Sequence, residues 1–142
     1  MQLRTEVEID ATPEQVWRAL VDFAAYPEWN PFIVNIAGEA VVGTTLELTI
    51  APPEGSERQF RPTVLVAEPN RELRWRGQLL ARWLFSGEHF FVLSPSGQGT
   101  RLVHGEDFAG VLVRLLRAQL ARTARGFVYM NRALKKRAEA PG

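Results

Sequence analysis

The chain has 142 residues, of which 46% are hydrophobic and 23% charged, and its net charge is +1. This length is enough to bury a core, and the composition excludes an intrinsically disordered chain. Because no cysteine is present, disulfides, thiolate nucleophiles, zinc–thiolate sites and iron–sulfur clusters are excluded. The longest apolar run is far shorter than a membrane-spanning helix, and the first residues alternate as in a strand instead of forming a secretory leader. We therefore expect a cytoplasmic protein with one domain over residues 1–142.

The N-terminal residues predict a strand followed by a short helix. Residues 2–10 alternate between apolar and polar side chains, which is typical of a strand with one face in water. Thr12 and Gln15 have the spacing of a capping box, with a proline at the first helical position between them. We expect this helix to end near Asp22, because residues 23–31 contain two prolines and cannot form a long element.

Between residues 32 and 108 the sequence predicts strands separated by turn residues. The turns contain Gly, Pro, Asn and Ser, and the connections are short, which indicates an antiparallel meander. Together with the N-terminal strand, the prediction is a sheet of seven strands. The six further strands are expected at residues 33–37, 44–50, 60–67, 71–77, 85–93 and 100–108.

Gly110 ends the strands, and residues 111–138 predict one long helix. An apolar stripe follows its three- and four-residue spacing: Leu112, Leu115, Leu116, Gln119, Leu120, Thr123, Phe127, Met130 and Leu134. Gly126 inside this helix indicates either a close approach to another backbone or room beside a ligand. The predicted fold is α+β, a curved seven-stranded antiparallel sheet wrapped around a long C-terminal helix, with short helices near the N-terminus.

Charge is distributed unevenly along the chain. Residues 111–138 contain eight basic side chains and no acidic one, whereas residues 1–110 contain nine basic and fifteen acidic side chains. These basic residues are either the solvated positions of an amphipathic helix or a contact for an anionic membrane surface. We expect the first and no nucleic-acid partner.

A curved sheet covered by one helix stands away from that helix over part of its length. The space between them is either an apolar cavity or is filled by large side chains, and the four Trp and eight Phe of the chain leave the second possibility open. We expect a cavity that holds a small hydrophobic molecule. The residues expected to line it are Trp29, Phe32, Leu48, Trp75, His89, Phe91, His104, Glu106, Phe108, Leu116, Gln119, Thr123 and Phe127.

Strand parity places both histidines of the chain on the inner face of the sheet. His104 and Glu106 alternate with Leu102, so all three point to the same side. If the turn at residues 95–99 sets Leu93 opposite Leu102, His89 lies opposite Glu106. A register two residues away would pair His89 with His104 or with a phenylalanine instead.

The group His89, His104 and Glu106 has three interpretations. The side chains can act as catalytic acid and base groups, orient a ligand carbonyl or hydroxyl, or satisfy one another as buried polar groups. Two histidines and one carboxylate are too few converging ligands to predict a metal ion, and no cofactor is expected.

Several short segments, taken in order, resemble the START-related, birch-allergen-like helix-grip superfamily (SRPBCC), and within it the polyketide cyclase/dehydrase-like branch. The resemblance covers nearly the whole chain and rests on residues 12–17 (TPEQVW), 26–32 (YPEWNPF), 73–77 (LRWRG), 89–91 (HFF), 99–110 (GTRLVHGEDFAG) and 126–135 (GFVYMNRALK). It implies a helix-grip fold and the binding, as carrier or sensor, of a lipid, isoprenoid or polyketide. The alternative it implies is a cyclase or dehydratase that uses His89, His104 and Glu106. A third hypothesis is an interaction module with a filled core.

Overall fold

The computed structural model describes residues 1–78 and 81–141. Its strands are β1 (Gln2–Ile9), β2 (Ile33–Ala37), β3 (Glu47–Ile50), β4 (Arg58–Phe60), β5 (Thr63–Glu68), β6 (Glu72–Gln78), β7 (Ser86–Ser96) and β8 (Gly99–Ala109). Its helices are α1 (Pro13–Val21), α2 (Tyr26–Trp29) and α3 (Arg117–Glu139), with short 3-10 segments η1 (Phe23–Ala25) and η2 (Val113–Leu116). This arrangement confirms the predicted α+β helix-grip fold.

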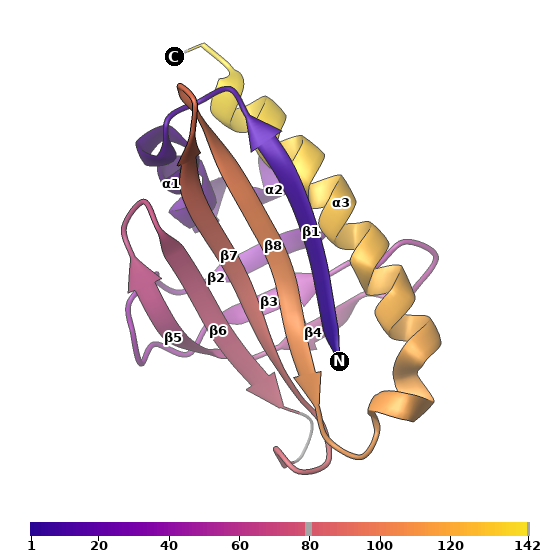
Figure 1. The fold of residues 1–142 in the computed structure, drawn as a ribbon. Coiled ribbons are helices and arrows are strands. Elements are labelled where there is room, and N and C mark those ends of the chain that lie inside the picture. Colours follow the sequence, from indigo (N-terminus) through magenta and orange to yellow (C-terminus); the bar gives the residue numbers. More distant parts are fainter. Residues whose placement is uncertain (79–80, 142) are drawn as a thin grey trace.

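Two hydrogen-bonded sheets form one curved surface. The larger has the order β1-β8-β7-β6-β5, and the smaller, β2-β3-β4, lies behind it with α3 along the β1 edge (Figure 1). The chain before β3 joins them, because Thr45 bridges Thr63 and Leu46 N–H donates to the Pro62 carbonyl at 2.8 Å. The predicted strand 60–67 is thus two strands, β4 and β5. The interruption falls at Pro62, which has no N–H to continue the ladder, so eight strands replace the predicted seven.

The β7–β8 hairpin sets the register on which the polar residues depend. Ser96 pairs with Gly99 across a tight turn in which Gly97 has a φ of +60°. Leu93 therefore lies opposite Leu102, as expected from the sequence. The alternatives with a two-residue slip are wrong.

The N-terminal helix begins as predicted. Thr12 accepts a hydrogen bond from the Gln15 N–H, and the Gln15 side chain accepts one from the Thr12 N–H, which completes the capping box. Helix α1 then buries Val16 and Leu20. The Tyr26 hydroxyl donates to the Leu20 carbonyl and ties α2 to α1.

The prediction of one helix over residues 111–138 is wrong at its start. The chain leaves β8 through Gly110 (φ +112°), forms η2, and becomes α-helical only from Arg117. Because a 3-10 turn has 3.0 residues instead of 3.6, the predicted apolar stripe does not continue through it. Leu115, expected on the stripe, is consequently 77% exposed.

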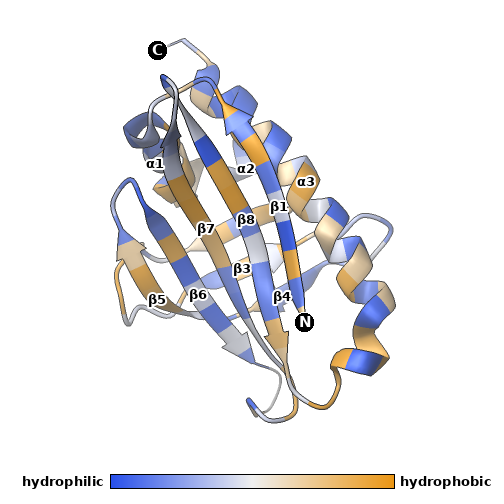
Figure 2. Cartoon of the chain, viewed as in Figure 1, coloured by the Kyte–Doolittle hydropathy of each residue, from blue (hydrophilic) through white to orange (hydrophobic). Residues whose placement is uncertain are grey.

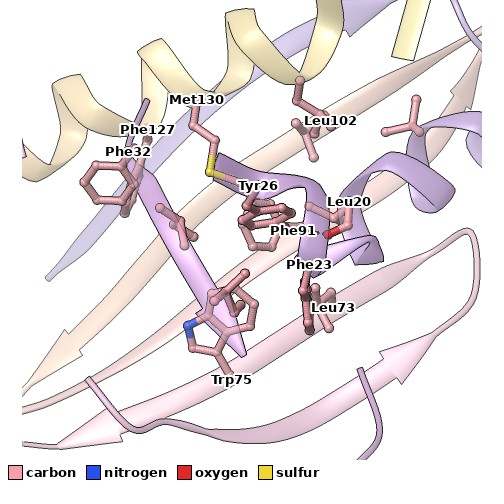
Figure 3. Close-up of a cluster of buried hydrophobic side chains, with 14 of the residues drawn as sticks. Leu20, Phe23, Tyr26, Phe32, Leu73, Trp75, Phe91, Leu102, Phe127 and Met130 are labelled. Carbon is pink, nitrogen blue, oxygen red and sulfur yellow. Dashed lines mark hydrogen bonds between the residues drawn. The ribbon is translucent and has the colours of Figure 1, made fainter. Parts of the chain in front are cut away.

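The hydrophobic core lies between the curved sheet and the helices. Figure 2 shows orange strand positions in the sheet, and the close-up in Figure 3 shows Phe127 and Met130 of α3 facing the Phe32 and Tyr26 side chains. A Cβ at Gly126 would lie 2.3 Å from the Phe32 ring, so this glycine makes room for a core side chain. Within residues 1–78 and 81–141, no helix is both long and apolar enough to cross a membrane.

Candidate functional site

A chain of hydrogen-bonded polar side chains links β7, β8, α3 and β1. His89 Nδ1 lies 3.2 Å from Glu106 Oε1, and His89 Nε2 lies 2.7 Å from His104 Nε2. His104 Nδ1 lies 2.7 Å from Asn131 Oδ1 of α3. Asn131 Nδ2 donates to Thr5 Oγ1 of β1 at 2.8 Å, and Thr5 Oγ1 donates to the His104 carbonyl at 2.7 Å. We call these five residues the polar chain.

The donor and the acceptor of each hydrogen bond in the polar chain can be assigned in order, starting from Thr5. Because the Thr5 hydroxyl donates to a carbonyl, its oxygen accepts from the Asn131 amide, and Asn131 Oδ1 must accept from His104. Neutral His104 then accepts at Nε2, so the proton between the two imidazoles belongs to His89. Neutral His89 in turn accepts at Nδ1, which requires a protonated carboxyl on Glu106. Every proton in the polar chain is thereby assigned.

Burial favours this uncharged arrangement. Desolvation lowers the pKa of His89 to about 3 and lowers the pKa of His104 well below its ordinary value. For Glu106, desolvation and then the nearby Asp107 charge raise the pKa from 4.5 to about 8. At neutral pH, Glu106 is therefore protonated and both imidazoles are neutral, in agreement with the hydrogen-bond directions.

Aromatic rings enclose the two imidazoles. Phe91 and Phe127 each stack on the His104 ring with a centroid distance of 4.3 Å. Trp75 stacks on the His89 ring at 5.1 Å with an interplanar angle of 19°. His104 has no exposed surface and His89 is 5% exposed. Side chains thus fill the space around both histidines.

Among the three titratable members of the polar chain, Glu106 is the most exposed. Its side chain is 18% exposed, compared with 7% for His89. The carboxyl lies over Gly87, where a Cβ would be 2.3 Å from Oε2 and 3.3 Å from the Phe108 ring. Phe108 also stacks on Phe85 at 5.6 Å. The free oxygen of Glu106 therefore lies beside Gly87 and near the Phe108 ring.

Most of the residues expected in the pocket come together. Trp75, His89, Phe91, His104 and Phe127 form one packed group, and Glu106 joins it through His89. Three further residues are buried in contact with this region or its neighbouring core: Phe32, Leu48 and Phe108.

The remaining expected residues lie elsewhere. Leu116, Gln119 and Thr123 are half-buried in η2 and the first turns of α3, and the Thr123 hydroxyl donates to the Gln119 carbonyl of its own helix. Trp29 packs edge-on against Tyr26, with a centroid distance of 5.1 Å. The Trp29 indole N–H is buried and has no acceptor among the described residues.

The sequence analysis missed Thr5 and Asn131. The alternation of residues 2–10 puts Thr5 on the same face of the first strand as Leu3 and Val7, and a hydroxyl on an apolar face requires a partner. Asn131 follows Phe127 by four residues, so helical spacing puts both on the same face of α3. A polar amide on the buried face of a helix requires a partner, and this was the signal that could have identified it.

Two hollows in the described part of the chain lie away from the polar chain. One is an open groove between the start of α1 and the β5–β6 turn, lined among others by Pro13 and Arg71. Another lies on the small sheet, beside Asn35 and Gln59. In residues 1–78 and 81–141, no three His, Asp or Glu side chains are grouped so as to hold a metal ion.

Comparison with known proteins agrees with this architecture. Residues 1–139 match the family described as polyketide cyclase/dehydrase and lipid transport. The chain belongs to this family. The match confirms the resemblance to the START-related, birch-allergen-like helix-grip superfamily and supports, in coarse terms, a hydrophobic ligand-binding or polyketide-cyclase role.

Solved structures with the same fold share little sequence with this polyketide cyclase/dehydrase and lipid transport family member. Protein MLL2253 from Mesorhizobium loti is 23% identical, with 96% of both chains covered and a TM-score of 0.75. The di-domain ARO/CYC BexL from the BE-7585A biosynthetic pathway is 16% identical, with a TM-score of 0.72 over 100% of this chain and 51% of that one. Ara h 8.0201 is 14% identical, with 97% of both chains covered and a TM-score of 0.68. These likenesses show the helix-grip fold. No curated protein matches the chain.

Proposed function

We propose that the protein binds a small hydrophobic molecule that carries a hydroxyl group, and that the free oxygen of Glu106 accepts a hydrogen bond from this hydroxyl. One observation carries the proposal: the polar chain uses all four imidazole nitrogens and leaves an oxygen of Glu106 free. The histidines are therefore positioning residues that hold the carboxyl and fix its proton. Glu106 is the group that remains for a ligand.

The surroundings of Glu106 favour an apolar ligand with one polar atom. Phe108 lies beside the carboxyl and stacks on Phe85, which provides apolar surface, while the free carboxyl oxygen accepts one hydrogen bond. The packed rings around His104 favour entry from the Glu106 end of the polar chain. A lipid, isoprenoid or polyketide has this chemistry, and the family description includes both lipid transport and polyketide cyclases.

Catalysis is the second candidate, and the pKa of Glu106 favours it specifically. A carboxyl with a pKa of about 8 can donate a proton near neutral pH and take one back, which suits the enolisation of a polyketone or the dehydration of an alcohol. When the free oxygen of Glu106 takes a proton from the ligand, the proton on the other oxygen moves to His89 Nδ1, and the reverse shift returns a proton to the ligand. The other hydrogen bonds of the polar chain stay unchanged. The carrier and the enzyme thus use the same carboxyl.

The test compares two substitutions of Glu106. In Glu106→Gln, the amide N–H still donates to His89 Nδ1 and the amide oxygen still accepts, but no proton can be transferred. In Glu106→Leu, the polar contact is removed. Native mass spectrometry of each purified protein, with extraction and identification of co-purified small molecules, reports which species are bound.

We expect a bound molecule in the unmodified protein and in Glu106→Gln, and at least a tenfold lower occupancy in Glu106→Leu. Turnover of the identified molecule by the unmodified protein but not by Glu106→Gln would assign catalysis. Equal occupancy in Glu106→Leu would refute the role of Glu106. The absence of any bound molecule from all three proteins would favour an interaction module with a filled core.

A further inference from the structure

Exposed hydrophobic side chains gather at the end of the sheet where β8 leaves for η2. Trp83 is 71% exposed, Val111 66% and Leu115 77%. Two chain segments bring them together, because Val111 N–H donates to the Trp83 carbonyl at 3.2 Å and Leu112 N–H donates to the Leu84 carbonyl at 3.1 Å. Figure 2 shows the hydrophobic colouring of the connection after β8 at this lower end of the molecule.

Gly110 fixes the approach of these two segments. A Cβ at this position would lie 2.5 Å from the Leu84 carbonyl oxygen, and its φ of +112° is one that L side chains rarely adopt. In η2, Leu115 N–H donates to the Leu112 carbonyl at 3.0 Å, and the Leu115 side chain, four residues after Val111, is exposed. We call Trp83, Val111 and Leu115 the apolar tip. A group of exposed apolar side chains of this kind is typical of an interaction site.

Positive charge surrounds the apolar tip. Arg82, Arg114 and Arg117 are exposed and flank its members in sequence, and within the described part of the chain none of them forms an ion pair. The acidic side chains next along the strands, Glu88 and Asp107, both pair with Arg74, at 3.5 Å and 3.6 Å. The tip therefore combines apolar side chains with uncompensated arginines.

We propose that the apolar tip and its three arginines dock onto an anionic lipid surface. Tryptophan and leucine insert into the boundary between headgroups and acyl chains, and arginine side chains pair with lipid phosphates and carboxylates. A protein partner with an apolar patch would leave the arginines without a role, whereas an anionic bilayer uses both features. This inference stands on the surface alone and does not depend on the function proposed for Glu106.

The experiment uses the full chain and vesicles of phosphatidylcholine with about 30% phosphatidylserine, compared with vesicles of phosphatidylcholine alone. Co-sedimentation measures binding, and tryptophan emission reports insertion, because Trp83 is the large exposed aromatic of the tip. One variant combines Trp83→Ser with Leu115→Ser. A second combines Arg82→Gln, Arg114→Gln and Arg117→Gln.

Matched controls change similar residues elsewhere. Val41 and Val42 are 53% and 62% exposed on another loop, so Val41→Ser with Val42→Ser controls for loss of apolar surface. Arg132→Gln controls for loss of an exposed charge farther along α3. All four variants change exposed side chains, so we expect their thermal unfolding midpoints to match that of the unmodified protein.

We expect binding to the anionic vesicles with a blue shift of the emission, and at least tenfold weaker binding to phosphatidylcholine. The apolar variant should bind at least tenfold more weakly, and each arginine removed should cost about fivefold at low ionic strength. Both controls should bind within about twofold of the unmodified protein. Equal binding to both vesicle types would overturn the proposal. So would self-association through the tip without vesicle binding, because the occupant would then be a second copy.

Discussion

Replacing Glu106 by glutamine should change the pH dependence of folding stability in a way that follows from the polar chain. Burial raises the pKa of Glu106 from 4.5 to about 8, so between these values the folded protein holds a proton that the unfolded chain has lost. The free energy of unfolding supplied by this proton is fully present below pH 4.5 and is lost as the pH rises through 8. Both imidazoles act in the opposite sense. Their lowered pKa values keep both imidazoles neutral in the fold, whereas the unfolded chain takes up protons on them below pH 6.5. The free energy of unfolding therefore falls as the pH drops below 6.5.

The magnitude follows from proton counting. One proton corresponds to about 1.4 kcal/mol per pH unit, and the loss tapers as the pH approaches the pKa of Glu106 in the fold. From pH 6.5 to pH 8, the carboxyl therefore lowers the unfolding free energy of the unmodified protein by about 2 kcal/mol. The two histidines raise it by about 1 kcal/mol over the same interval, since in the unfolded chain they still hold protons at pH 6.5 and lose them by pH 8. The unmodified protein should be most stable near pH 6.5, and Glu106→Gln should lack the decline above it.

Urea unfolding followed by circular dichroism at pH 5, 6.5 and 8 measures these differences. Because both proteins share every other titrating group, the difference between them isolates Glu106. We expect the stability gap between Glu106→Gln and the unmodified protein to move by about 2 kcal/mol in favour of the variant from pH 6.5 to pH 8. A gap that stays constant with pH would mean that the carboxyl is ionised in the fold, and the assigned hydrogen-bond directions would be wrong.

Three further substitutions test the packing around the polar chain. Asn131→Leu should destabilise the fold by about 2 kcal/mol, because it leaves a buried imidazole N–H without an acceptor, and urea unfolding measures this. Gly87→Ala should cost about 1–3 kcal/mol by pushing the Glu106 carboxyl off its imidazole partner, and a changed ¹⁵N shift of that ring would confirm the displacement. Gly126→Ala should lower the melting temperature although alanine favours helices by about 1 kcal/mol, because the new methyl group meets the buried Phe32 ring. A higher melting temperature for this last variant would show that the ring can move aside.

Local rules were sufficient to predict the strands, the capped helix and the β7–β8 register. Side-chain alternation predicts which face of the sheet each residue occupies, and the tight turn between β7 and β8 fixes the register of the two strands. The predicted pairing of His89 with Glu106 was therefore correct. The break at Pro62 was also present in the sequence, as a proline inside a predicted strand, and it was overlooked.

The start of the long helix could not be predicted from periodicity. Residues 111–116 have helical spacing, but the bond from Leu112 to the Leu84 carbonyl holds this segment against another loop. Such a tertiary contact overrides local preference. For the same reason, the exposure of Leu115 was not foreseen, and its apolar character was assigned to the core.

The polar chain also shows why parity alone was insufficient to assign roles to the two histidines. Parity places His89 and His104 on the same inner face of the sheet. From the sequence alone, the same catalytic role can therefore be assigned to either histidine. The contact with Asn131 makes them different, because it fixes the tautomer of His104 and, through it, the proton on His89. Both nitrogens of each imidazole are then hydrogen-bonded within the polar chain. The contact with α3 therefore fixes, through the two imidazoles, the proton on the Glu106 carboxyl. The Asn131 amide thus determines that, of the three titratable groups, Glu106 keeps an oxygen free for a further hydrogen bond. This outcome depends on a contact between two residues that are 27 positions apart in the sequence.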